Sequence, residues 1–529
     1  MKRINLILVS LLISVMGVSA QNFRTGYFLD GYMYKYQLNP AFQGERGFIA
    51  FPVIGGVALG VESNLAAGTF LYPYDGKLLT FLHPKISDQK FMDQIATSNP
   101  VNLNLDMNIF ALGFRVKNTY HTLEMSLKSM QSASLPGDVF KFMKTGGSDG
   151  NNLYDFSSLS FNGNVYSELA YGFSIKIKDF ISVGLRAKLL MGVMSMYTDI
   201  PQFQLSLQQD KWTINAEGAS VLMPSVFASA LTTDNMTDEQ MITQITNMLT
   251  QPSLGAAFDL GVSVDFLKYF TASASILDLG FISWKNMDRL SLKSGYWEYT
   301  GMDNLSGGQN SDFQSQIDAK LEELESLLDF ERTQSLDNSV QTLGFTTMLG
   351  LEFRMPFYQR LTVGALGTHR FEGSRSWTEG RFSLNLAPLR WFSLTANYAI
   401  STFGQSYGAA LNIHPKGFNL FLGLDSFKPL LNVTPEFIPI DELNTNLKFG
   451  VTFPFGKYNG RYPKATAAKD TKQTKSKKES VKKESSKKNY AKCATARFQL
   501  PNLRSDSLIN KFRTEPSPKF RSRAFSLSN

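Results

Sequence analysis

Apolar and polar residues alternate strictly in a stretch near the middle of the chain, at 257–266 (AFDLGVSVDF). One face of this stretch is apolar and consists of Phe258, Leu260, Val262, Val264 and Phe266. The other face carries Asp259, Gly261, Ser263 and Asp265. After three turn residues the alternation resumes at 270–276 (FTASASI). Because side chains of a β-strand point alternately to opposite faces, the pattern predicts two strands joined in a hairpin.

The same two-residue period returns on both sides of this hairpin. It is clear in the second half of the chain, at 345–353, 381–388, 391–399, 417–427 and 446–456. It is noisier in the first half, at 48–60, 103–116, 122–130, 159–177 and 181–196. Strands of about 10 residues joined by short turns are typical of a closed antiparallel barrel with an even number of strands. The pattern therefore predicts an all-β, antiparallel transmembrane β-barrel of about 12 to 16 strands.

Three segments do not follow the strand pattern. Residues 234–249 begin with helix-capping residues, and 313–330 place Ile317, Leu321 and Leu324 at helical spacing among acidic residues. Both stretches lie between blocks of strands, so we expect helical insertions in long loops. Residues 22–46 are rich in Tyr and Gly and precede the first strand. We interpret them as a plug-like segment that fills the lumen of the barrel.

The alternative to a barrel is a soluble exported all-β binding protein, such as a sandwich or a propeller. Beyond the N-terminus, no window reaches the roughly 18 apolar residues that indicate a transmembrane helix. The hydrophobic content of 43% fits both classes, since only alternate residues of a barrel strand face lipid. The single cysteine, the strand length, the 13% aromatic content and a second face made mostly of Ser, Thr, Asn and Gly favour the barrel.

The first residues have the pattern of a secretory signal peptide. Lys2 and Arg3 form a short positive region, and residues 4–18 are mostly apolar. Val18 and Ala20 occupy the −3 and −1 positions of a signal-peptidase site. An N-terminal anchor is the alternative, but the apolar run is shorter than the roughly 20 residues of a spanning helix. We predict cleavage after Ala20 and localisation in the outer membrane.

The composition changes abruptly at Lys457. Residues 457–529 contain 20 Lys and Arg and 5 Asp and Glu, a net charge of +15, so the preceding residues carry −7 and the whole chain +8. Residues 464–492 are of low complexity and are expected to be disordered. Such a tail could be a solvated spacer, or it could contact anionic lipid head groups or the cell wall. No nucleic-acid partner is expected for an exported chain.

Residues that could serve catalysis or bind a metal do not form a recognisable motif. The four histidines are isolated in the sequence: His83, His121, His369 and His414. Cys493 is alone in the tail, and neither a G-x-S-x-G elbow nor a P-loop is present. The sequence therefore predicts a protein that is not an enzyme and has no cofactor or metal site. Asp259 and Asp265 would face the lumen, where they could favour cations and polar solutes or act as hydrogen-bonded structural groups.

Two short stretches carry a family resemblance. Asn39, Pro40 and Ala41, just before the first expected strand, resemble the NPA signature at that position in several barrel families. Together with 275–284 (SILDLGFISW), this stretch resembles an uncharacterised branch, with a domain of unknown function, of the long-chain fatty-acid transporter superfamily and the barrels associated with type IX secretion and gliding. The resemblance covers 21–456 in layout and implies a monomeric barrel of about 14 strands with the N-terminal segment in its lumen. The lysine-rich tail and the helical insertions depart from the transporter pattern.

These observations divide the chain into four parts. They are a signal peptide at 1–20, a plug-like segment at 21–46, an outer-membrane β-barrel at 47–456 and a basic tail at 457–529. We expect either a channel or transporter for a hydrophobic or small solute, or a barrel component of a secretion or surface-assembly system. Its partners would be outer-membrane lipid and either that solute or a secretion-system protein. The alternative remains a soluble exported binding protein on the periplasmic or surface side.

Overall fold

The computed structural model describes most of the chain between Phe23 and Gly460. The described residues are 23–52, 54–147, 152–232, 237–293, 295–301, 318, 322–323, 329–373, 376–427 and 445–460. The predicted signal peptide, most of the predicted helix at 313–330 and the tail from residue 461 lie outside them. Cleavage after Ala20 therefore stays a prediction.

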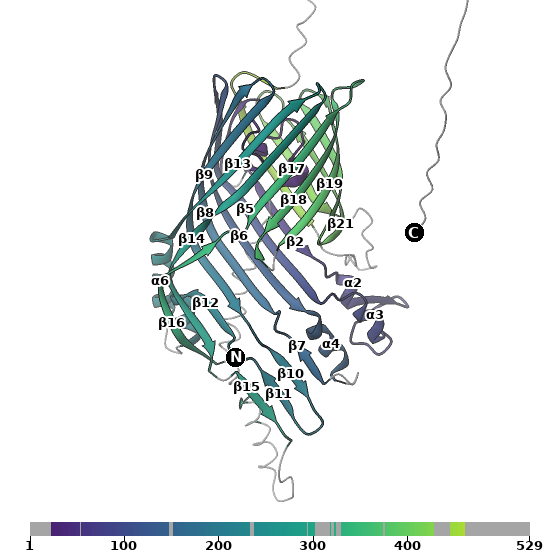
Figure 1. Ribbon diagram of the computed structural model, residues 1–529, viewed down its shortest axis with the longest axis vertical. Helices are drawn as coiled ribbons and strands as arrows, with labels where there is room; N and C mark the ends of the chain where they lie inside the picture. Colours follow the sequence, from purple (N-terminus) through teal and green to yellow (C-terminus); the bar gives the residue numbers. More distant parts are fainter. Residues whose placement is uncertain are drawn as a thin grey trace, which may run out of the picture. The chain divides into compact units, whose positions relative to one another are not determined.

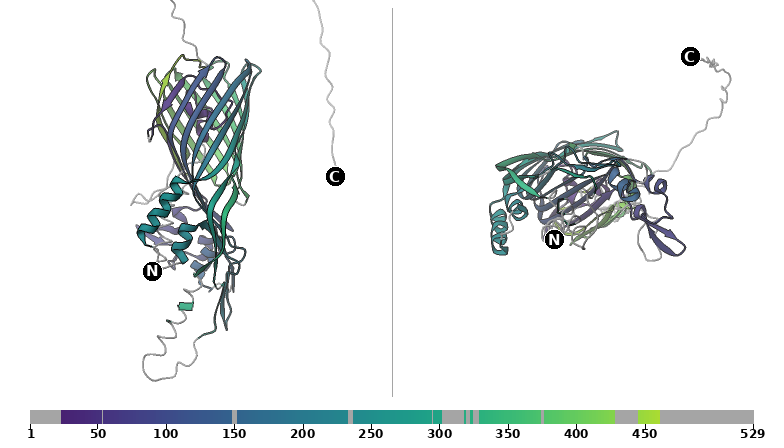
Figure 2. Two further views of the ribbon diagram at one scale, coloured as in Figure 1. Left: turned by 90° about the vertical axis from the view of Figure 1, so that its left-hand side faces the viewer. Right: turned by 90° about the horizontal axis from the view of Figure 1, so that it is seen from below.

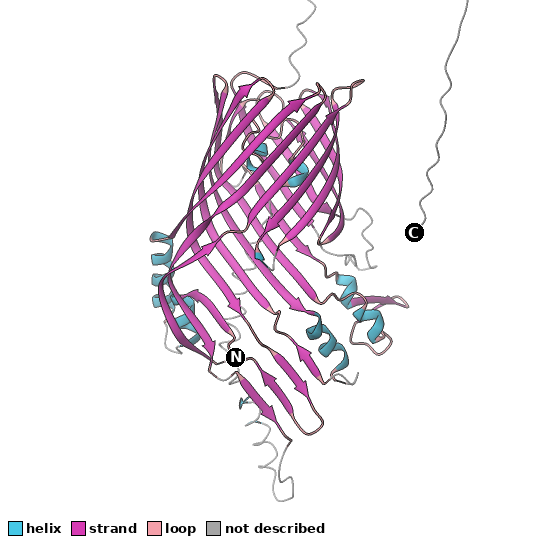
Figure 3. Cartoon of the chain, viewed as in Figure 1, coloured by secondary structure: helices cyan, strands magenta, loops and turns pink. Residues whose placement is uncertain are grey.

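A closed antiparallel barrel forms the centre of the described structure (Figures 1 and 3). Its strands, in chain order, are β1 (Gly47–Ala50), β2 (Val57–Ser63), β5 (Ser98–Val116), β6 (Thr119–Pro136), β8 (Ser160–Lys178), β9 (Ile181–Asp199), β13 (Ser253–Phe266), β14 (Phe270–Leu292), β17 (Phe345–Arg354), β18 (Leu361–Phe371), β19 (Trp377–Leu389), β20 (Phe392–Ser401), β21 (Gly404–Ile413), β22 (Asn419–Phe427) and β23 (Thr445–Phe455). β1 and β2 lie one after the other between β5 and β23, so they form one interrupted strand. Because this strand pairs with β23, the ring closes with 14 strands, as predicted.

The first strand position differs from the prediction of one strand over 48–60. The structure interrupts it between the end of β1 and the start of β2. Pro52 lies in the interruption and has no backbone N–H for the ladder. The neighbouring strand remains bonded to the interruption, since Val451 N donates to Ile54 O at 2.7 Å. The break is therefore a local irregularity of the wall, and the ring stays closed around it.

Two barrel strands had no clear signal in the sequence. β18 and β21 carry small residues at several outward positions, such as Ala365, Gly367 and Ala409. Small side chains weaken the contrast between the two faces, so neither strand was predicted from the alternation. Each of them is paired along its length with a strand on either side: β18 pairs with β17 and β19, and β21 pairs with β20 and β22.

The outer face of the barrel is apolar, and its inner face is polar. On β13, Phe258 and Leu260 are 50% and 48% exposed, whereas Asp259 between them is fully buried. The same alternation exposes apolar side chains around the ring: Leu185, Leu189, Leu254, Ile276, Phe281, Leu349, Phe382, Leu384, Ile400, Leu422 and Phe449. We call this set, with Phe258 and Leu260, the lipid belt. Strands that contact lipid alternate in this way, because only their outward residues meet hydrocarbon.

The barrel wall is taller on one side than on the other (Figure 2). Strands β5, β6, β8, β9 and β14 contain 18 to 23 residues. We call them, together with β13 between β9 and β14, the tall side. Strands β17 to β23 contain 9 to 13 residues, and we call them the low side. β12 (Ser220–Pro224) and β16 (Phe330–Thr342) add to the tall side by pairing with the outer part of β14. The barrel thus has a long-loop end and, opposite it, a short-turn end.

Short strands and helices are inserted at the long-loop end, and of those named here the sequence predicted only the last helix. They are β3 (Leu71–Tyr74), β4 (Lys77–Thr80), β7 (Leu153–Asp155), β10 (Gln204–Leu207), β11 (Trp212–Asn215), β15 (Tyr296–Tyr299), α2 (Ala67–Phe70), α3 (Asp88–Met92), α4 (Gly137–Thr145), α5 (Ser225–Thr232) and α6 (Asp238–Thr250). Helix α6 corresponds to the predicted helix at 234–249, and it begins later because Thr237 and Gln240 form a capping box. The predicted extension of a second helix to Phe330 is wrong, since Phe330 begins β16. Among the described residues, no helix has the length and apolarity needed to cross a membrane.

The N-terminal segment, residues 23–46, lies inside the barrel (Figure 3). It contains the short 3-10 helices η1 (Arg24–Gly26) and η2 (Met33–Gln37). Its aromatic side chains form a buried cluster with the wall, in which the ring centroids of Tyr34 and Phe421 lie 5.5 Å apart. Edge-to-face contacts of this kind add to the stabilisation from burial. The segment, together with the inward side chains of the wall, fills this part of the lumen.

Candidate functional site

Arg24 joins the N-terminal segment to three carboxylates of the barrel. Its Nε lies 2.9 Å from Asp425 Oδ2 and 3.5 Å from Glu379 Oε1, and its Nη2 lies 3.0 Å from Glu62 Oε1. Arg381 completes the group with a contact of 2.8 Å to Glu379. All five side chains are buried, and we call them the anchor cluster. Since the acids come from β2, β19 and β22, one arginine of the segment contacts three strands.

The low side also binds the backbone of the segment. Ser393 Oγ donates to Asp30 O at 2.6 Å, and Asn412 Nδ2 donates to the same oxygen at 3.2 Å. Asn419 Nδ2 donates to Gly31 O at 2.8 Å. A buried segment outside any sheet has carbonyls without ladder partners, and leaving them unbonded would be unfavourable. The asparagines and the serine supply those partners.

A second group of charges lies in the lumen of the tall side, and we call it the wall cluster. Four of its members are buried and two are half-buried: Glu168, Arg186, Lys188 and Asp259, and then Lys128 and Asp278. Lys188 Nζ lies 2.7 Å from Asp259 Oδ1, and Arg186 Nη2 lies 3.0 Å from Glu168 Oε1. Lys128 Nζ lies 2.8 Å from Glu168 Oε2. Every member thus contacts a partner of opposite charge, which buried ions require.

Glu124 of β6 connects the wall cluster to the segment by hydrogen bonds and an ion pair. Its Oε2 lies 3.1 Å from Arg186 Nη2 and accepts a hydrogen bond from Tyr36 OH at 2.7 Å. Gln37 Nε2 donates to Glu124 Oε1 at 2.8 Å, and Lys448 Nζ of the low side donates to Gln37 Oε1 at 2.9 Å. The helix η2 therefore lies between the two sides of the lumen and hydrogen-bonds to both.

The two acids predicted to face the lumen lie in different surroundings. Asp259 is fully buried, contacts Lys188 and accepts a hydrogen bond from Asp278 N at 2.7 Å, where Asp278 has a φ of 63°. Its contacts fit the hydrogen-bonded structural alternative. Asp265 lies near the short-turn end, its side chain is 55% exposed, and it accepts a hydrogen bond from Thr271 Oγ1. The structure therefore does not bring the two acids together.

The NPA residues lie against two glycines of the wall. Asn39 Nδ2 donates to Val262 O at 3.2 Å and to Ala274 O at 3.1 Å, and Asn39 Oδ1 accepts from Ala41 N at 2.9 Å. A Cβ on Gly184 would lie 2.1 Å from Pro40 O, and a Cβ on Gly261 would lie 2.1 Å from Asn39 Oδ1. No side chain fits at those distances, so both glycines are required for this close approach. We call this contact the NPA seat.

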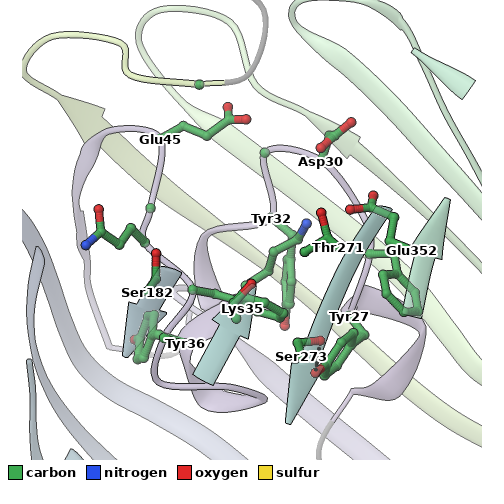
Figure 4. A pocket seen from close by; sticks show the side chains of 18 of the residues that line it. Tyr27, Asp30, Tyr32, Lys35, Tyr36, Glu45, Ser182, Thr271, Ser273 and Glu352 are labelled. Carbon is green, nitrogen blue, oxygen red and sulfur yellow. Dashed lines mark hydrogen bonds between the residues drawn. The ribbon is translucent and has the colours of Figure 1, made fainter. Parts of the chain in front are cut away.

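A cavity of about 230 Å³ lies between the segment and the strand ends near the NPA seat (Figure 4). The segment contributes aromatic and charged side chains to its lining: Tyr27, Asp30, Tyr32, Lys35, Tyr36 and Glu45. The wall contributes Ser182, Thr271, Ser273 and Glu352, and Asp265 also lies on the lining. Aromatic faces next to hydroxyl and charged groups can accommodate a small molecule with both apolar and polar parts.

Most residues of the two charged clusters were missed by the sequence reasoning. Only Asp259 was singled out, although Arg186 and Lys188 are two residues apart on β9, as are Glu379 and Arg381 on β19. Charges that recur at the inward phase of a strand were the available signal. Arg24 had no such signal, because the segment has no strand period. Within the described part of the chain, no group of three or more His, Cys, Asp or Glu has the arrangement of a metal site.

A model of a protein family of unknown function, DUF5723, matches residues 40–425. The chain belongs to this family. The match begins at Pro40 of the NPA seat and ends at Asp425 of the anchor cluster, so it spans nearly the whole barrel and excludes the basic tail. This confirms the predicted resemblance to a barrel branch with a domain of unknown function. No protein with a curated description matches the sequence.

Several solved structures of barrels are similar to this member of the DUF5723 family. A FadL homologue from Pseudomonas aeruginosa has a TM-score of 0.40 and 11% identity, with 83% of this chain and 100% of that chain covered. The toluene transporter TodX from Pseudomonas putida has a TM-score of 0.37 and 8% identity, with coverage of 81% and 94%. The toluene transporter TbuX from Ralstonia pickettii has a TM-score of 0.36 and 7% identity, with coverage of 80% and 93%. The count of 14 strands given above comes from the strand pairings within this chain and does not rest on these structures.

Proposed function

We propose that this chain is an outer-membrane barrel that passes a small hydrophobic or amphipathic solute, with the N-terminal segment as the element that closes the lumen. The observation that carries this proposal is the cavity of about 230 Å³ between the segment and the wall. The segment contacts the wall through side chains, as Arg24 and Tyr36 do, and these contacts lie outside the strand ladders. A segment bound in this way can shift without breaking the ring of strands.

The membrane assignment is supported by the lipid belt. A closed ring with an apolar outer band satisfies its backbone hydrogen bonds internally, which is the condition for spanning hydrocarbon with strands. In bacterial outer-membrane barrels, short turns face the periplasm and longer loops face the outside. The cavity would then lie at the periplasmic side, and the tall side would extend outward from the membrane.

The same orientation bears on the two ends of the chain. Phe455 pairs with Gly47 at the short-turn end, and the described residues end shortly after it, at Gly460. Residues 457–460 would therefore lie on the periplasmic side. The lysines of the tail could contact the cell wall or anionic head groups. A signal peptide at 1–20, a segment at 21–46 and a barrel at 47–456 remain part of the proposal.

Dye uptake by bacterial cells tests the proposal. The wild-type chain, Arg24→Met and an empty vector are expressed in cells whose outer membrane slows the entry of N-phenyl-1-naphthylamine. We expect faster entry with the wild-type chain than with the empty vector, and the fastest entry with Arg24→Met, because that variant weakens the hold on the segment. Equal entry in all three strains, with both proteins folded in the outer membrane, would refute a solute channel.

A second candidate function, a barrel of a secretion or surface-assembly system, is favoured by the tall side. Its strands run well past the low side and carry the sheet of β7, β10, β11 and β15, a surface that transport alone does not require. Deleting the β10–β11 hairpin should abolish co-purification of an assembly partner and leave dye entry unchanged. Recovery of the mature chain in the soluble fraction, without detergent, would instead support the soluble binding protein and end both barrel hypotheses.

A further inference from the structure

One strand position of the tall side is interrupted where the barrel meets its long-loop extension. β12 ends at Pro224 and β13 begins at Ser253, and helices α5 and α6 lie between them in the sequence. The last residues with which β12 pairs are Tyr197 of β9 and Met287 of β14. The next strand, β13, begins opposite Gly192 of β9. Within the described residues, 193–196 and 284–286 therefore have no strand partner on this side. In the sequence, helices α5 and α6 thus stand where a continuous strand would join β12 to β13.

A cavity of about 380 Å³ occupies this interruption. Helix α6 and the residue after it contribute Met248 and Gln251, and the wall contributes Gly192, Trp284 and Met287. Volumes of this size are typical of pockets for small molecules. The lining mixes apolar surface from methionine and tryptophan with amide and hydroxyl groups, so it suits a ligand with an apolar body and a polar group.

Trp284 is the side chain that gives the cavity a specific chemistry. Its side chain is among the largest fully buried ones, with an exposed fraction of 2%, and it packs with Leu190 and Ile282. A Cβ on Gly192 would lie 2.5 Å from Trp284 Cζ3, so the glycine is required for the ring to lie this close to β9. The ring is therefore held by the wall, and its orientation does not depend on the helices.

The indole Nε1 of Trp284 has no hydrogen-bond acceptor within the part of the chain that the structure describes. Nε1 is only a donor, and buried tryptophans usually bond it. Leaving a buried donor unbonded costs about 1–3 kcal/mol. A ligand that brings an acceptor into the cavity would remove this cost, whereas a pure hydrocarbon would not.

The cavity also lies at the edge of the lipid belt. Two members of the belt, Leu254 and Phe281, lie within a few residues of the residues that line the cavity. Further along β14, the next outward residue after Ser283 is Lys285, which is exposed. Apolar side chains thus give way to a cation at the level of the cavity. Amphipathic molecules concentrate at such a boundary, where the apolar body can remain in hydrocarbon and the polar group in contact with water.

We infer that the interruption between β12 and β13 is a binding site for a small amphipathic molecule with one hydrogen-bond acceptor, such as an aliphatic alcohol. The apolar body lies between Met248 and Met287, and the oxygen accepts a hydrogen bond from Trp284 Nε1. This site is at the opposite end of the barrel from the cavity beside the N-terminal segment. It goes beyond the proposed function, because binding here requires neither solute passage nor movement of the segment.

Tryptophan fluorescence of the full chain in nanodiscs tests the inference, with 1-octanol and octane as a matched pair of probes. Both are titrated by mole fraction in the lipid, and only the alcohol has an acceptor. We expect a saturable change in emission with octanol, at a concentration roughly three- to ten-fold lower than with octane, the range expected for one hydrogen bond. Trp284→Phe should remove both the emission change and the preference for octanol.

Two further variants keep the result interpretable. Trp391→Phe removes an exposed tryptophan of the short-turn end and should leave the octanol response intact. Met248→Phe adds bulk to the cavity from α6 without altering a barrel strand or adding a fluorophore, so octanol binding should weaken even if Trp284→Phe folds poorly. An octanol response that saturates equally in wild type, Trp284→Phe and Met248→Phe would overturn the site, as would the absence of any saturable response. Dye entry is measured separately, so its failure would bear only on the proposed function.

Discussion

The two sides of the lumen use buried charge differently. On the low side, inward side chains bind the N-terminal segment: Arg24 contacts Asp425 and Glu379, and Asn419 binds the backbone at Gly31. On the tall side, charges pair mainly with one another, as Lys188 does with Asp259. Removing the segment would leave the acids of the low side without Arg24. The pairs of the wall cluster would remain complete.

This difference separates two tasks that a filled barrel must accomplish. The wall cluster closes part of the lumen permanently, because its ion pairs join strands that cannot move apart. The anchor cluster depends on a segment that belongs to no strand, so its ion pairs can form and break while the ring stays closed. Buried ion pairs are costly to desolvate and contribute little net stability, but removing one partner is strongly destabilising. Single substitutions should therefore distinguish the two clusters clearly.

The largest effect is expected for Arg24→Met. The substitution leaves Glu379 and Asp425 with Arg381 as their cation and Glu62 with the amide of Asn446, so binding of the segment should weaken by about 3–5 kcal/mol. Limited trypsin digestion in detergent measures this, since cleavage after Lys35 requires the segment to leave the lumen. We expect rapid cleavage in Arg24→Met and slow cleavage in wild type.

The matched control for this variant is Arg289→Met. Arg289 lies in the extension of the tall side, where its Nη1 donates to Ser220 Oγ at 3.0 Å. Its loss should not change cleavage after Lys35. Slow cleavage in Arg24→Met would contradict the role of the anchor cluster, provided that the variant shows the heat-modifiable band of a folded barrel.

A different result is expected for Lys188→Met. Asp259 and Asp278 would lose a shared cation inside the wall, at a cost of about 3–5 kcal/mol to the barrel itself. The temperature at which the folded band converts to the unfolded band should fall, while cleavage after Lys35 stays slow. Release of the segment by this variant would show that the two sides are not independent.

Lys211→Met is the control for Lys188→Met. Lys211 and Glu298 form an ion pair at 3.5 Å in the sheet of the long-loop end, and both side chains are more than a third exposed. Exposed pairs contribute only about 0–1 kcal/mol, so the conversion temperature should remain close to that of wild type.

Much of the barrel could be predicted from the sequence because lipid imposes a simple pattern. Outward positions such as Phe258 and Leu260 must be apolar, and this repeats along each strand. β18 and β21 were not predicted because they have small residues at outward positions, which weakens the alternation. Small residues suit an outward position beside larger ones, as Ala365 does beside Phe382. The break between β1 and β2 depends on Pro52 within an otherwise apolar stretch, where alternation alone suggests one strand.

The candidate site could be predicted only in part. Asn39, Pro40 and Ala41 were singled out by resemblance, but their partners Gly184 and Gly261 lie far away in the sequence, and nothing local indicates that a backbone will approach them. Charge pairing in the lumen has the same difficulty, because the register of neighbouring strands decides which acid meets which base. Whether a segment forms a strand depends on its own sequence, whereas the side chains that it contacts in the lumen depend on the other strands.

A moderate effect is expected for Gly261→Ala. Its Cβ would lie 2.1 Å from Asn39 Oδ1, so the NPA seat must open, at a cost of about 1–3 kcal/mol for an overpacked position. Cleavage after Lys35 should accelerate, but less than in Arg24→Met. Gly380→Ala is the control, because a Cβ at that position has no atom within 4 Å. Equal cleavage rates for both alanine variants would contradict the seat.

The smallest effect is expected from pH, through His414 of the short-turn end. Burial lowers the pKa of His414 to about 4, with Asp30 opposing and Arg46 adding to this shift. A Cβ on Gly31 would lie 2.5 Å from His414 Nε2, so the ring lies directly against the segment. Since the pKa is about 6.5 in an unfolded chain, the unfolded or undocked state binds more protons below that value. Stability contributed by the neutral ring is therefore complete above about pH 7 and is lost as the pH falls toward 4.

Between pH 7.5 and 6.0 this linkage amounts to about 1 kcal/mol. The measurement is cleavage after Lys35 at the two pH values, normalised to the cleavage of an unfolded peptide so that the pH dependence of trypsin cancels. Wild type should be cleaved faster at the lower pH, and His414→Gln should lose most of that difference because its side chain does not titrate. The same acceleration in His414→Gln would assign the pH dependence to other groups. In that case the low side would hold the segment by its ion pairs and amide contacts alone, without a contribution from the histidine.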